Sequence, residues 1–172
     1  MNLQPTLENA SVILLPLEKG DFEFLFSVAS DPAVWEQHPN KDRWERAAFQ
    51  AFFEGALQSE GAFKVIEKTT GDVIGSTRFY DYSAEKDRVF IGYTFYAKRC
   101  WGTGINPGVK RLMLGYVSKF VSFVYFHIGA CNIRSQIAIT RLGAVKLGEE
   151  YVAPFGDLPQ LHYLYKINLH KS

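Results

Sequence analysis

The sequence predicts one α/β (α+β) domain spanning residues 1–172, and three observations carry that prediction. Apolar residues alternate with a period of two between residues 62 and 96, which is typical of neighbouring strands. Segments with helical spacing of apolar residues lie before and after that region. A glycine-containing turn, residues 99–106, joins an apolar strand-like run to a helix-like run. Strands are expected over residues 11–17, 63–67, 73–80, 88–96, 121–128, 145–152 and 161–169, and helices over 21–28, 43–59, 107–120 and 133–142.

Turn and capping residues set the boundaries in the first half of the chain. Asp21 can cap the first helix, and Asp31-Pro32 ends it. Residues 35–39 are then expected to form a loop. Gly71 can adopt a positive φ, so residues 69–72 are predicted to form the turn of a hairpin.

Similar signals organise the second half. Pro107 is expected at the first position of a helix, where its missing N–H costs nothing. Residues 121–128 are nearly all apolar, which predicts a strand buried on both faces. Asn132 can cap the following helix, and Gly143 can end it. A turn at Gly156-Asp157 separates the last two strands.

Composition excludes several classes of protein. Hydrophobic residues make up 47% of the chain, which suffices for a real core. The 19 Lys and Arg residues nearly balance the 18 Asp and Glu residues, so we expect no nucleic-acid partner. The apolar runs are too short to cross a membrane, and the N-terminus does not resemble a signal peptide. Two isolated cysteines indicate reduced thiols, and the four histidines lack metal-site spacing, so a cytoplasmic protein without a metal is expected.

The turn at residues 99–106 has the shape of an anion site. Gly102 and Gly104 remove side chains from the turn, so backbone N–H groups can point at one anion. The helix that follows contributes its unpaired N–H groups and the positive end of its dipole. Strand, glycine turn and helix in this order favour a phosphate or pyrophosphate ligand. A phosphate-binding loop of the nucleoside-triphosphatase type is disfavoured, because no Gly-Lys-Ser/Thr follows the glycines.

Three motifs in order carry a resemblance to a known family. Arg99-x-x-Gly102-x-Gly104 is similar to a pyrophosphate loop, Ile91-Gly92-Tyr93 to the strand before it, and Asn132-x-x-Ser135 to the helix after the next strand. The chain thereby resembles the GNAT superfamily of acetyl-CoA-dependent N-acetyltransferases, and within it the RimJ/RimL-like branch of ribosomal-protein N-terminal acetyltransferases.

The resemblance implies a fold and a donor site. The fold would be a mixed, mostly antiparallel sheet flanked by helices, with two central parallel strands that splay apart. Acetyl-CoA would lie in the gap between those strands. The residues that the resemblance assigns to it are Tyr93, Thr94, Arg99, Trp101, Gly102, Thr103, Gly104, Ile105, Asn106, Asn132 and Ser135. Lys98, Lys110 and Arg111 would either attract its phosphates or be solvated surface charges.

The resemblance leaves the catalytic groups open. The tyrosine that many members use as an acid is replaced by Ile139, and Ser135 is the candidate to donate a hydrogen bond to the departing sulfur, or else a helix-capping residue. The glutamate that often serves as a base is replaced by Phe90. Candidate bases are His38, whose ordinary pKa suits proton transfer, and Asp81.

The acceptor is expected to be a primary amine, either a protein N-terminus or a small molecule. Trp35, His38, Arg78 and Tyr80 are the candidate acceptor-binding residues. Two alternatives remain: a CoA-binding sensor or interaction module with impaired catalysis, and an acyltransferase that uses another acyl-CoA. The aromatic C-terminal strand pair could also support a homodimer.

Overall fold

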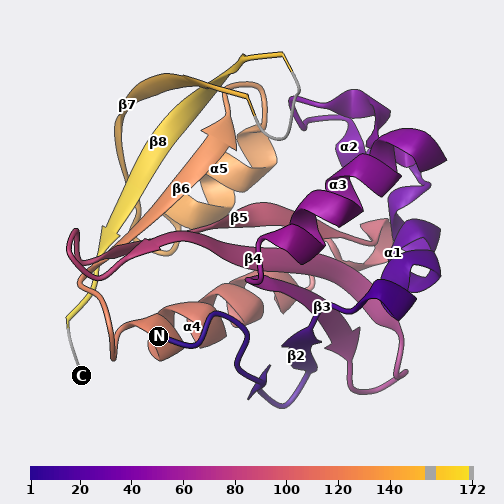
Figure 1. Cartoon of the computed structure of the whole chain (residues 1–172), viewed down its shortest axis with the longest axis horizontal. Helices are drawn as coiled ribbons and strands as arrows, with labels where there is room; N and C mark the ends of the chain where they lie inside the picture. Colours follow the sequence, from indigo (N-terminus) through magenta and orange to yellow (C-terminus); the bar gives the residue numbers. More distant parts are fainter. Residues whose placement is uncertain (154–157, 171–172) are drawn as a thin grey trace.

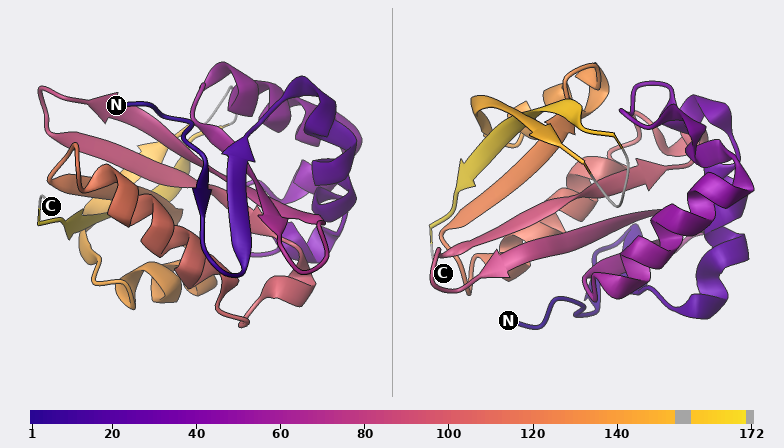
Figure 2. Two further views of the ribbon diagram at one scale, coloured as in Figure 1. Left: turned by 90° about the horizontal axis from the view of Figure 1, so that it is seen from below. Right: turned by 45° about the horizontal axis from the view of Figure 1, so that its top comes forward.

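The computed structural model describes residues 1–153 and 158–170, which form one eight-stranded sheet covered by helices on both faces (Figures 1 and 2). The strand order is β1-β2-β3-β4-β5-β6-β8-β7. The strands are β1 (Leu7–Glu8), β2 (Val12–Pro16), β3 (Ala62–Glu67), β4 (Val73–Ser83), β5 (Arg88–Tyr96), β6 (Phe123–Gly129), β7 (Val145–Val152) and β8 (Gln160–Asn168). The helices are α1 (Phe22–Ala29), α2 (Pro32–Trp35), α3 (Arg46–Gln58), α4 (Ile105–Val117) and α5 (Ile133–Thr140), with 3-10 turns η1 (Lys19–Asp21), η2 (Lys41–Trp44) and η3 (Lys98–Cys100).

Each face of the sheet has its own hydrophobic core. Helices α4 and α5 pack on one face through residues such as Met113 and Ile139. Helices α1, α2 and α3 pack on the other face, around Trp35, Phe49 and Phe95. The two cores fix the sheet between the helices, so its central strands are held from both sides.

The two parallel strands diverge at the centre of the sheet. Strand β5 pairs with β6 only from Arg88 to Phe90, opposite Phe123 to Tyr125. Strand β5 continues beside β4 as far as Tyr96, and β6 continues beside β8 as far as Gly129. The gap thus opens from Ile91 onward, and this confirms the predicted α+β fold with splayed parallel strands.

A β-bulge lies beside this gap. The register between β4 and β5 shifts between Ser76 and Arg78, so Tyr93 and Thr94 together face Thr77. Tyr93 has a φ of 52°, in the left-handed region that aromatic residues rarely adopt. A bulge interrupts the regular ladder of hydrogen bonds and changes the direction in which the neighbouring backbone groups point.

Several helix boundaries differ from the expectation. Trp35 ends helix α2 instead of starting a loop, because Asp31 caps this helix through the N–H of Ala33 and Pro32 takes its first position. The helix expected over residues 43–59 is divided at Glu45, whose φ of −79° and ψ of 136° are extended. Pro107 is the third helical residue and not the first, because Gly104 occupies the N-cap; it still lies in the first turn, where no N–H is needed.

The C-terminal strands also correct and extend the prediction. Strand β6 is not buried on both faces: Val124 and Phe126 are buried, whereas Phe123, Tyr125 and His127 on the other face are half-buried. Strands β7 and β8 form the predicted antiparallel pair. The turn expected at Gly156-Asp157 lies outside the described residues.

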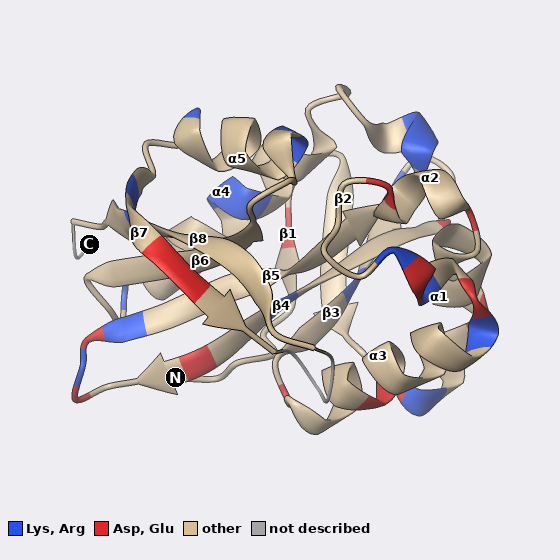
Figure 3. Ribbon diagram, turned by 90° about the horizontal axis from the view of Figure 1, so that it is seen from above, with Lys and Arg blue, Asp and Glu red and all other residues tan. Residues whose placement is uncertain are grey.

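Charges of both signs are intermixed over the molecule. Figure 3 shows Lys and Arg on α4 and α5, Asp and Glu on β7, and residues of both signs around α1 and α3. The formal net charge of the chain is +1. Among the described residues, no helix is long and apolar enough to cross a membrane.

Candidate active site

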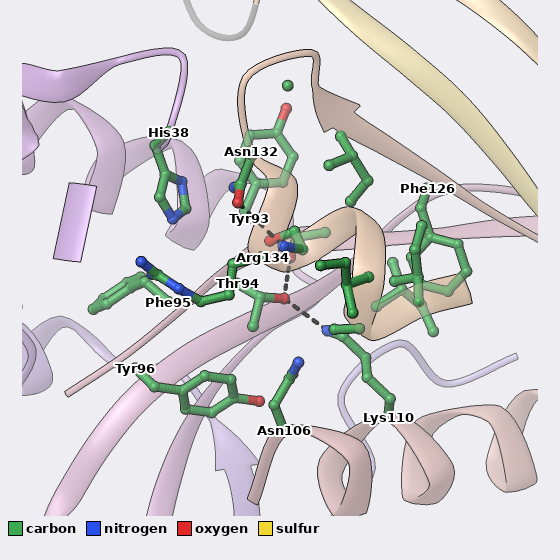
Figure 4. Close-up of a pocket in the computed structure, with 18 of the residues that line it drawn as sticks. His38, Tyr93, Thr94, Phe95, Tyr96, Asn106, Lys110, Phe126, Asn132 and Arg134 are labelled. Atoms are coloured by element: carbon green, nitrogen blue, oxygen red, sulfur yellow. Dashed lines mark hydrogen bonds between the residues drawn. The ribbon is translucent and has the colours of Figure 1, made fainter. Parts of the chain in front are cut away.

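A cavity of about 840 Å³ occupies the gap between β5 and β6. The bulge of β5, the start of α4 and the start of α5 line it, together with the segment between α2 and α3. Figure 4 shows Lys110 and Asn106 projecting from α4 toward Thr94, with His38 and Asn132 on the opposite side. Elements far apart in the sequence therefore meet at one site.

The glycine turn has the conformation that the sequence predicts. Gly102 has a φ of 72° and Gly104 a φ of 85°, and Gly104 is the N-cap of α4. A Cβ added to either glycine would meet nothing within 4 Å, so the backbone of the turn is open to a ligand. The first N–H groups of α4 lack partners within the helix and point out of its end.

Two buried polar atoms mark the cavity as a ligand site. Neither Tyr96 Oη nor Asn106 Oδ1 has a hydrogen-bond partner among the described residues, although both side chains line the cavity. Buried polar atoms normally find partners, because leaving one unpaired costs about 1–3 kcal/mol. An open glycine turn and orphaned polar groups fit a polar ligand such as a CoA thioester.

Most of the predicted donor-binding residues meet at this cavity. Those that line it are Tyr93, Thr94, Trp101, Gly102, Gly104, Asn106, Asn132 and Ser135. The side chains of Thr103 and Ile105 are not part of the lining; Thr103 instead donates to the carbonyl of Cys100 at 2.6 Å. These two residues can reach a ligand only through their backbone.

The guanidinium of Arg99 lies on the β3–β4 hairpin and not in the cavity. It contacts Glu67 at 2.8 Å and Asp72 at 3.3 Å. The hydrogen bond from Arg99 lowers the pKa of the Glu67 carboxyl. Arg99 therefore attaches the glycine turn to the hairpin.

Helix α5 contributes a capped N-terminus to the cavity. Asn132 Oδ1 accepts from the N–H of Ser135 at 3.2 Å, which confirms the predicted cap. Its first turn carries Arg134, whose guanidinium lies 3.7 Å from the ring centre of Trp101. This contact joins α5 to the glycine turn across the cavity.

The burial of Lys110, which was expected to attract phosphates or to be a solvated surface charge, is what the sequence analysis missed most clearly. Its side chain is 4% exposed, and Nζ lies 2.7 Å from Thr94 Oγ1 and 3.1 Å from Thr77 Oγ1. Burial lowers the pKa of Lys110 to about 7. The signal was present in the sequence, because Lys110 lies at helical spacing from the apolar Met113 and Val117.

Of the four predicted acceptor-binding residues, two line the cavity and two are buried behind its wall. His38 and Tyr80 line the cavity. Trp35 and Arg78 are 1% and 2% exposed and lie behind the wall. Trp35 donates to the carbonyl of Ala29 at 2.7 Å, and the Arg78 guanidinium lies 3.9 Å from the ring centre of Tyr93.

The electrostatics of His38 limit what it can do. Burial lowers the pKa of His38 to about 3, and the nearby charges of Arg43 and Arg134 act in the same direction. The imidazole is therefore neutral at pH 7 and holds a proton only weakly. Of the two departures from the family pattern, Phe90 is buried in an aromatic stack and Ile139 is buried in the α5 core. Among the described residues, no group of three or more His, Cys, Asp or Glu could hold a metal ion.

Comparison with known proteins identifies the family. Residues 11–145 match the model of the acetyltransferase (GNAT) domain, and the chain belongs to this family of acetyltransferases. A search of curated proteins finds no match. The members of this family use acetyl-CoA as the acetyl donor.

Solved structures share the fold at low sequence identity. A GCN5-related N-acetyltransferase from Brucella melitensis is 19% identical with a TM-score of 0.81, covering 96% of this chain and 79% of the other. The spermidine N-acetyltransferase of Vibrio cholerae, solved with CoA and spermine, is 16% identical with a TM-score of 0.70 and coverages of 95% and 98%. The ribosomal L7/L12 α-N-protein acetyltransferase RimL, solved with CoA, is 10% identical with a TM-score of 0.77 and coverages of 98% and 100%.

Proposed function

We propose that this acetyltransferase transfers the acetyl group of acetyl-CoA directly to a primary amine, either a protein N-terminus or a small molecule. The observation that carries the proposal is one cavity in which the β5 bulge faces the open glycine turn across a gap in the sheet. Three motifs favour the RimJ/RimL-like branch: Ile91-Gly92-Tyr93 before the glycine turn, Gly104-Ile105-Asn106 within it, and Asn132-x-x-Ser135 after it.

In the donor half of the cavity, backbone N–H groups of residues 101–106 bind the pyrophosphate. The positive φ of Gly102 and Gly104 and the N-terminus of α4 support this assignment. Arg99 contributes by holding the turn through Glu67 and Asp72, not by touching a phosphate. Asn132, 6% exposed and in the lining, holds the pantetheine arm.

The bulge polarises the thioester. A backbone N–H of strand β5 near Tyr93 donates to the carbonyl oxygen as negative charge develops there. The hydroxyl of Thr94 hydrogen-bonds with Lys110 Nζ and with the hydroxyl of Thr77, so the bulge is rigid. Rigid donors stabilise the transition state without reorganising.

Ser135 donates a hydrogen bond to the departing sulfur. It lies in the first turn of α5, its side chain lines the cavity, and Ile139 offers no hydroxyl. Ser135→Ala is expected to lower kcat about tenfold while leaving the Kd for acetyl-CoA unchanged, since one hydrogen bond made in the transition state is worth about 1.4 kcal/mol. Thiol release and calorimetry measure the two quantities.

Thr140→Ala is the matched control for Ser135. It removes an exposed hydroxyl from the other end of the same helix, outside the cavity. An unchanged kcat in Ser135→Ala would leave Ser135 with a structural role only.

His38 and Tyr80 form the acceptor wall. His38 is neutral at pH 7, so it can accept a hydrogen bond from the acceptor but stores a proton poorly. Trp35 supports His38 from behind, with ring centres 5.0 Å apart, and Arg78 supports Tyr93. These two residues shape the wall without touching the acceptor.

Two alternatives are distinguished by one pair of assays. Phe90 and Ile139 favour a CoA-binding sensor, because each replaces a family catalytic residue; an acyltransferase with another acyl-CoA would share the same cavity. Thermal shift with acetyl-CoA, other acyl-CoAs and CoA comes first, and thiol release over a panel of amines follows. Stabilisation by acetyl-CoA with transfer to an amine supports the proposed function. Stabilisation without transfer favours the sensor.

The proposed enzyme is a homodimer and is located in the cytoplasm. Edge strand β7 carries three exposed apolar side chains, Val145, Leu147 and Tyr151, which a second copy could cover. Light scattering after gel filtration is expected to give twice the chain mass of 19.5 kDa. Leu147→Glu is expected to return the mass to that of one chain, and a monomeric wild type would contradict the dimer.

A further inference from the structure

Three side chains from three strands form a hydrogen-bonded chain along the acceptor wall. Tyr80 Oη on β4 lies 3.4 Å from Nδ1 of His127 on β6. The other ring nitrogen of His127, Nε2, lies 2.8 Å from Glu150 Oε2 on β7. Tyr80 and His127 both line the cavity, whereas the Glu150 side chain is 49% exposed at the sheet surface.

The direction of each hydrogen bond follows from the chemistry of its partners. Burial raises the pKa of the Tyr80 hydroxyl well above its ordinary value, so this hydroxyl stays protonated and donates. The Glu150 carboxylate can only accept. His127 therefore accepts at Nδ1 and donates from Nε2, which is the tautomer of an imidazole ready to take up a proton at Nδ1.

The hydrogen-bonded series of side chains begins at Tyr80, beside the bulge of β5. A Cβ at Gly92 would lie 3.1 Å from Tyr80 Cε1 and 3.4 Å from Tyr80 Oη, so the absent side chain makes room for the Tyr80 ring. Gly92 directly precedes the bulged Tyr93, whose ring centre is 5.1 Å from that of Tyr80. The hydroxyl of Tyr80 thus lies beside the backbone that is assigned to the thioester carbonyl.

Phe90 packs against the rings of Tyr80 and His127 and holds both in position. Its ring centre lies 4.9 Å from that of His127 and 5.2 Å from that of Tyr80. It occupies the position where the resemblance places a glutamate base. The neighbouring strands therefore supply a different pair of acid–base groups at the same place on the wall.

We propose that Tyr80, His127 and Glu150 form a proton relay that takes the proton from the acceptor amine. The inference rests on the proposed function. As the amine nitrogen bonds to the carbonyl carbon, its proton passes to Tyr80 Oη while the Tyr80 proton passes to His127 Nδ1. The C–S bond then breaks, and the thiolate of CoA takes a proton from the Ser135 side of the cavity or from water.

Glu150 is a positioning residue in this relay. Its carboxylate fixes the tautomer of His127 and stabilises the imidazolium that forms. After the product leaves, the imidazolium loses the proton at Nδ1 to water in the cavity, which restores the Nε2–H tautomer, and Nε2–H stays hydrogen-bonded to Glu150 throughout. Other titratable or charged groups also face this relay. His162 on β8 has its ring centre 6.4 Å from that of His127. The remaining ones are His38, Arg43 in η2, Arg78 and Asp81 on β4, and Tyr93 on β5.

The test uses the full chain, acetyl-CoA, and the best alkylamine or peptide from the acceptor panel, with hydroxylamine as a weakly basic acceptor. His127→Ala is expected to lower kcat with the alkylamine about 100-fold, the low end of general-base contributions. Added imidazole restores part of that loss. The loss is much smaller with hydroxylamine, which is already neutral at pH 7. Tyr80→Phe and Glu150→Gln are likewise expected to lower kcat more with the alkylamine or peptide than with hydroxylamine.

Matched controls separate the relay from packing. Tyr125→Phe removes a hydroxyl from a ring that also stacks on Phe90 but lies outside the cavity lining. Glu149→Gln removes the neighbouring carboxylate, which pairs with Lys146. Both are expected to keep the wild-type kcat. Unchanged acetyl-CoA binding by calorimetry shows that the His127→Ala protein is folded.

Three outcomes overturn the relay. An unchanged kcat in His127→Ala overturns the relay but leaves the proposed function standing. An equal loss with both acceptors and no rescue by imidazole assigns His127 a structural role and also overturns it. Wild-type protein that binds acetyl-CoA but transfers to no amine overturns the proposed function, and the relay with it.

Discussion

Gly102→Glu is expected to weaken acetyl-CoA binding by more than about 100-fold, or about 2.8 kcal/mol. The turn around Gly102 is open, and its backbone N–H groups and the N-terminus of α4 offer positive charge to a pyrophosphate. A glutamate there would place a carboxylate in the anion site and repel the ligand. Calorimetry with acetyl-CoA gives the affinity directly.

Gly71→Glu is the matched control for Gly102→Glu. Gly71 has a φ of 78° and open space around it, so its replacement carries the same backbone strain and the same added charge. It lies in the turn between β3 and β4 and does not line the large cavity. Wild-type affinity in Gly71→Glu is expected, and wild-type affinity in Gly102→Glu would refute the assignment of the turn.

Lys110→Met is expected to stabilise the protein by about 1–4 kcal/mol at pH 6, the range found when buried charges are replaced by apolar side chains. Burial lowers the pKa of Lys110 to about 7 from an ordinary value near 10.5. Below pH 7 the buried amine is charged in the folded protein and costs free energy. Thr77 and Thr94 keep each other as partners at 2.8 Å when the amine is removed.

The stabilisation by Lys110→Met is expected to depend on pH. Between about pH 7 and 10.5 the unfolded chain binds the lysine proton and the folded chain does not, so wild-type stability rises with pH over this window. The gain from Lys110→Met is therefore largest below pH 7 and becomes smaller by pH 9. Urea unfolding at pH 6 and pH 9 measures both values.

Lys119→Met, at an exposed position just after α4, is the control for Lys110→Met. It is expected to change the free energy of unfolding little, and equally at both pH values. A Lys110→Met protein that is destabilised to the same extent at pH 6 and pH 9 would contradict the account of a desolvated amine.

Local signals predicted most of the fold, the glycine turn and the cap of α5. The positive φ at Gly71 follows from turn chemistry, and the Asn132 cap follows from helix chemistry, so both could be predicted from single residues. The splay of β5 and β6 came from the family resemblance. It has no local signal, because strand pairing depends on residues that are distant in the sequence.

The acceptor half depended on tertiary contacts and was predicted less well. Trp35 has the composition of a pocket residue but is buried behind the wall. Arg99 was expected at a phosphate, and its ion pairs with the β3–β4 hairpin could not be read from spacing. Tyr80, His127 and Glu150 are widely separated in the chain, and only the folded sheet brings them together.

Amide NMR of the full chain with and without acetyl-CoA tests the central claim most directly, namely that the gap between β5 and β6 binds the donor. The amide signals of Tyr93, Thr94, residues 101–106 and the first turn of α5 are expected to shift on addition of acetyl-CoA. The amide signals of the turn between β3 and β4 should stay in place. Shifts confined to other regions, or no shifts at saturating acetyl-CoA, would contradict the account.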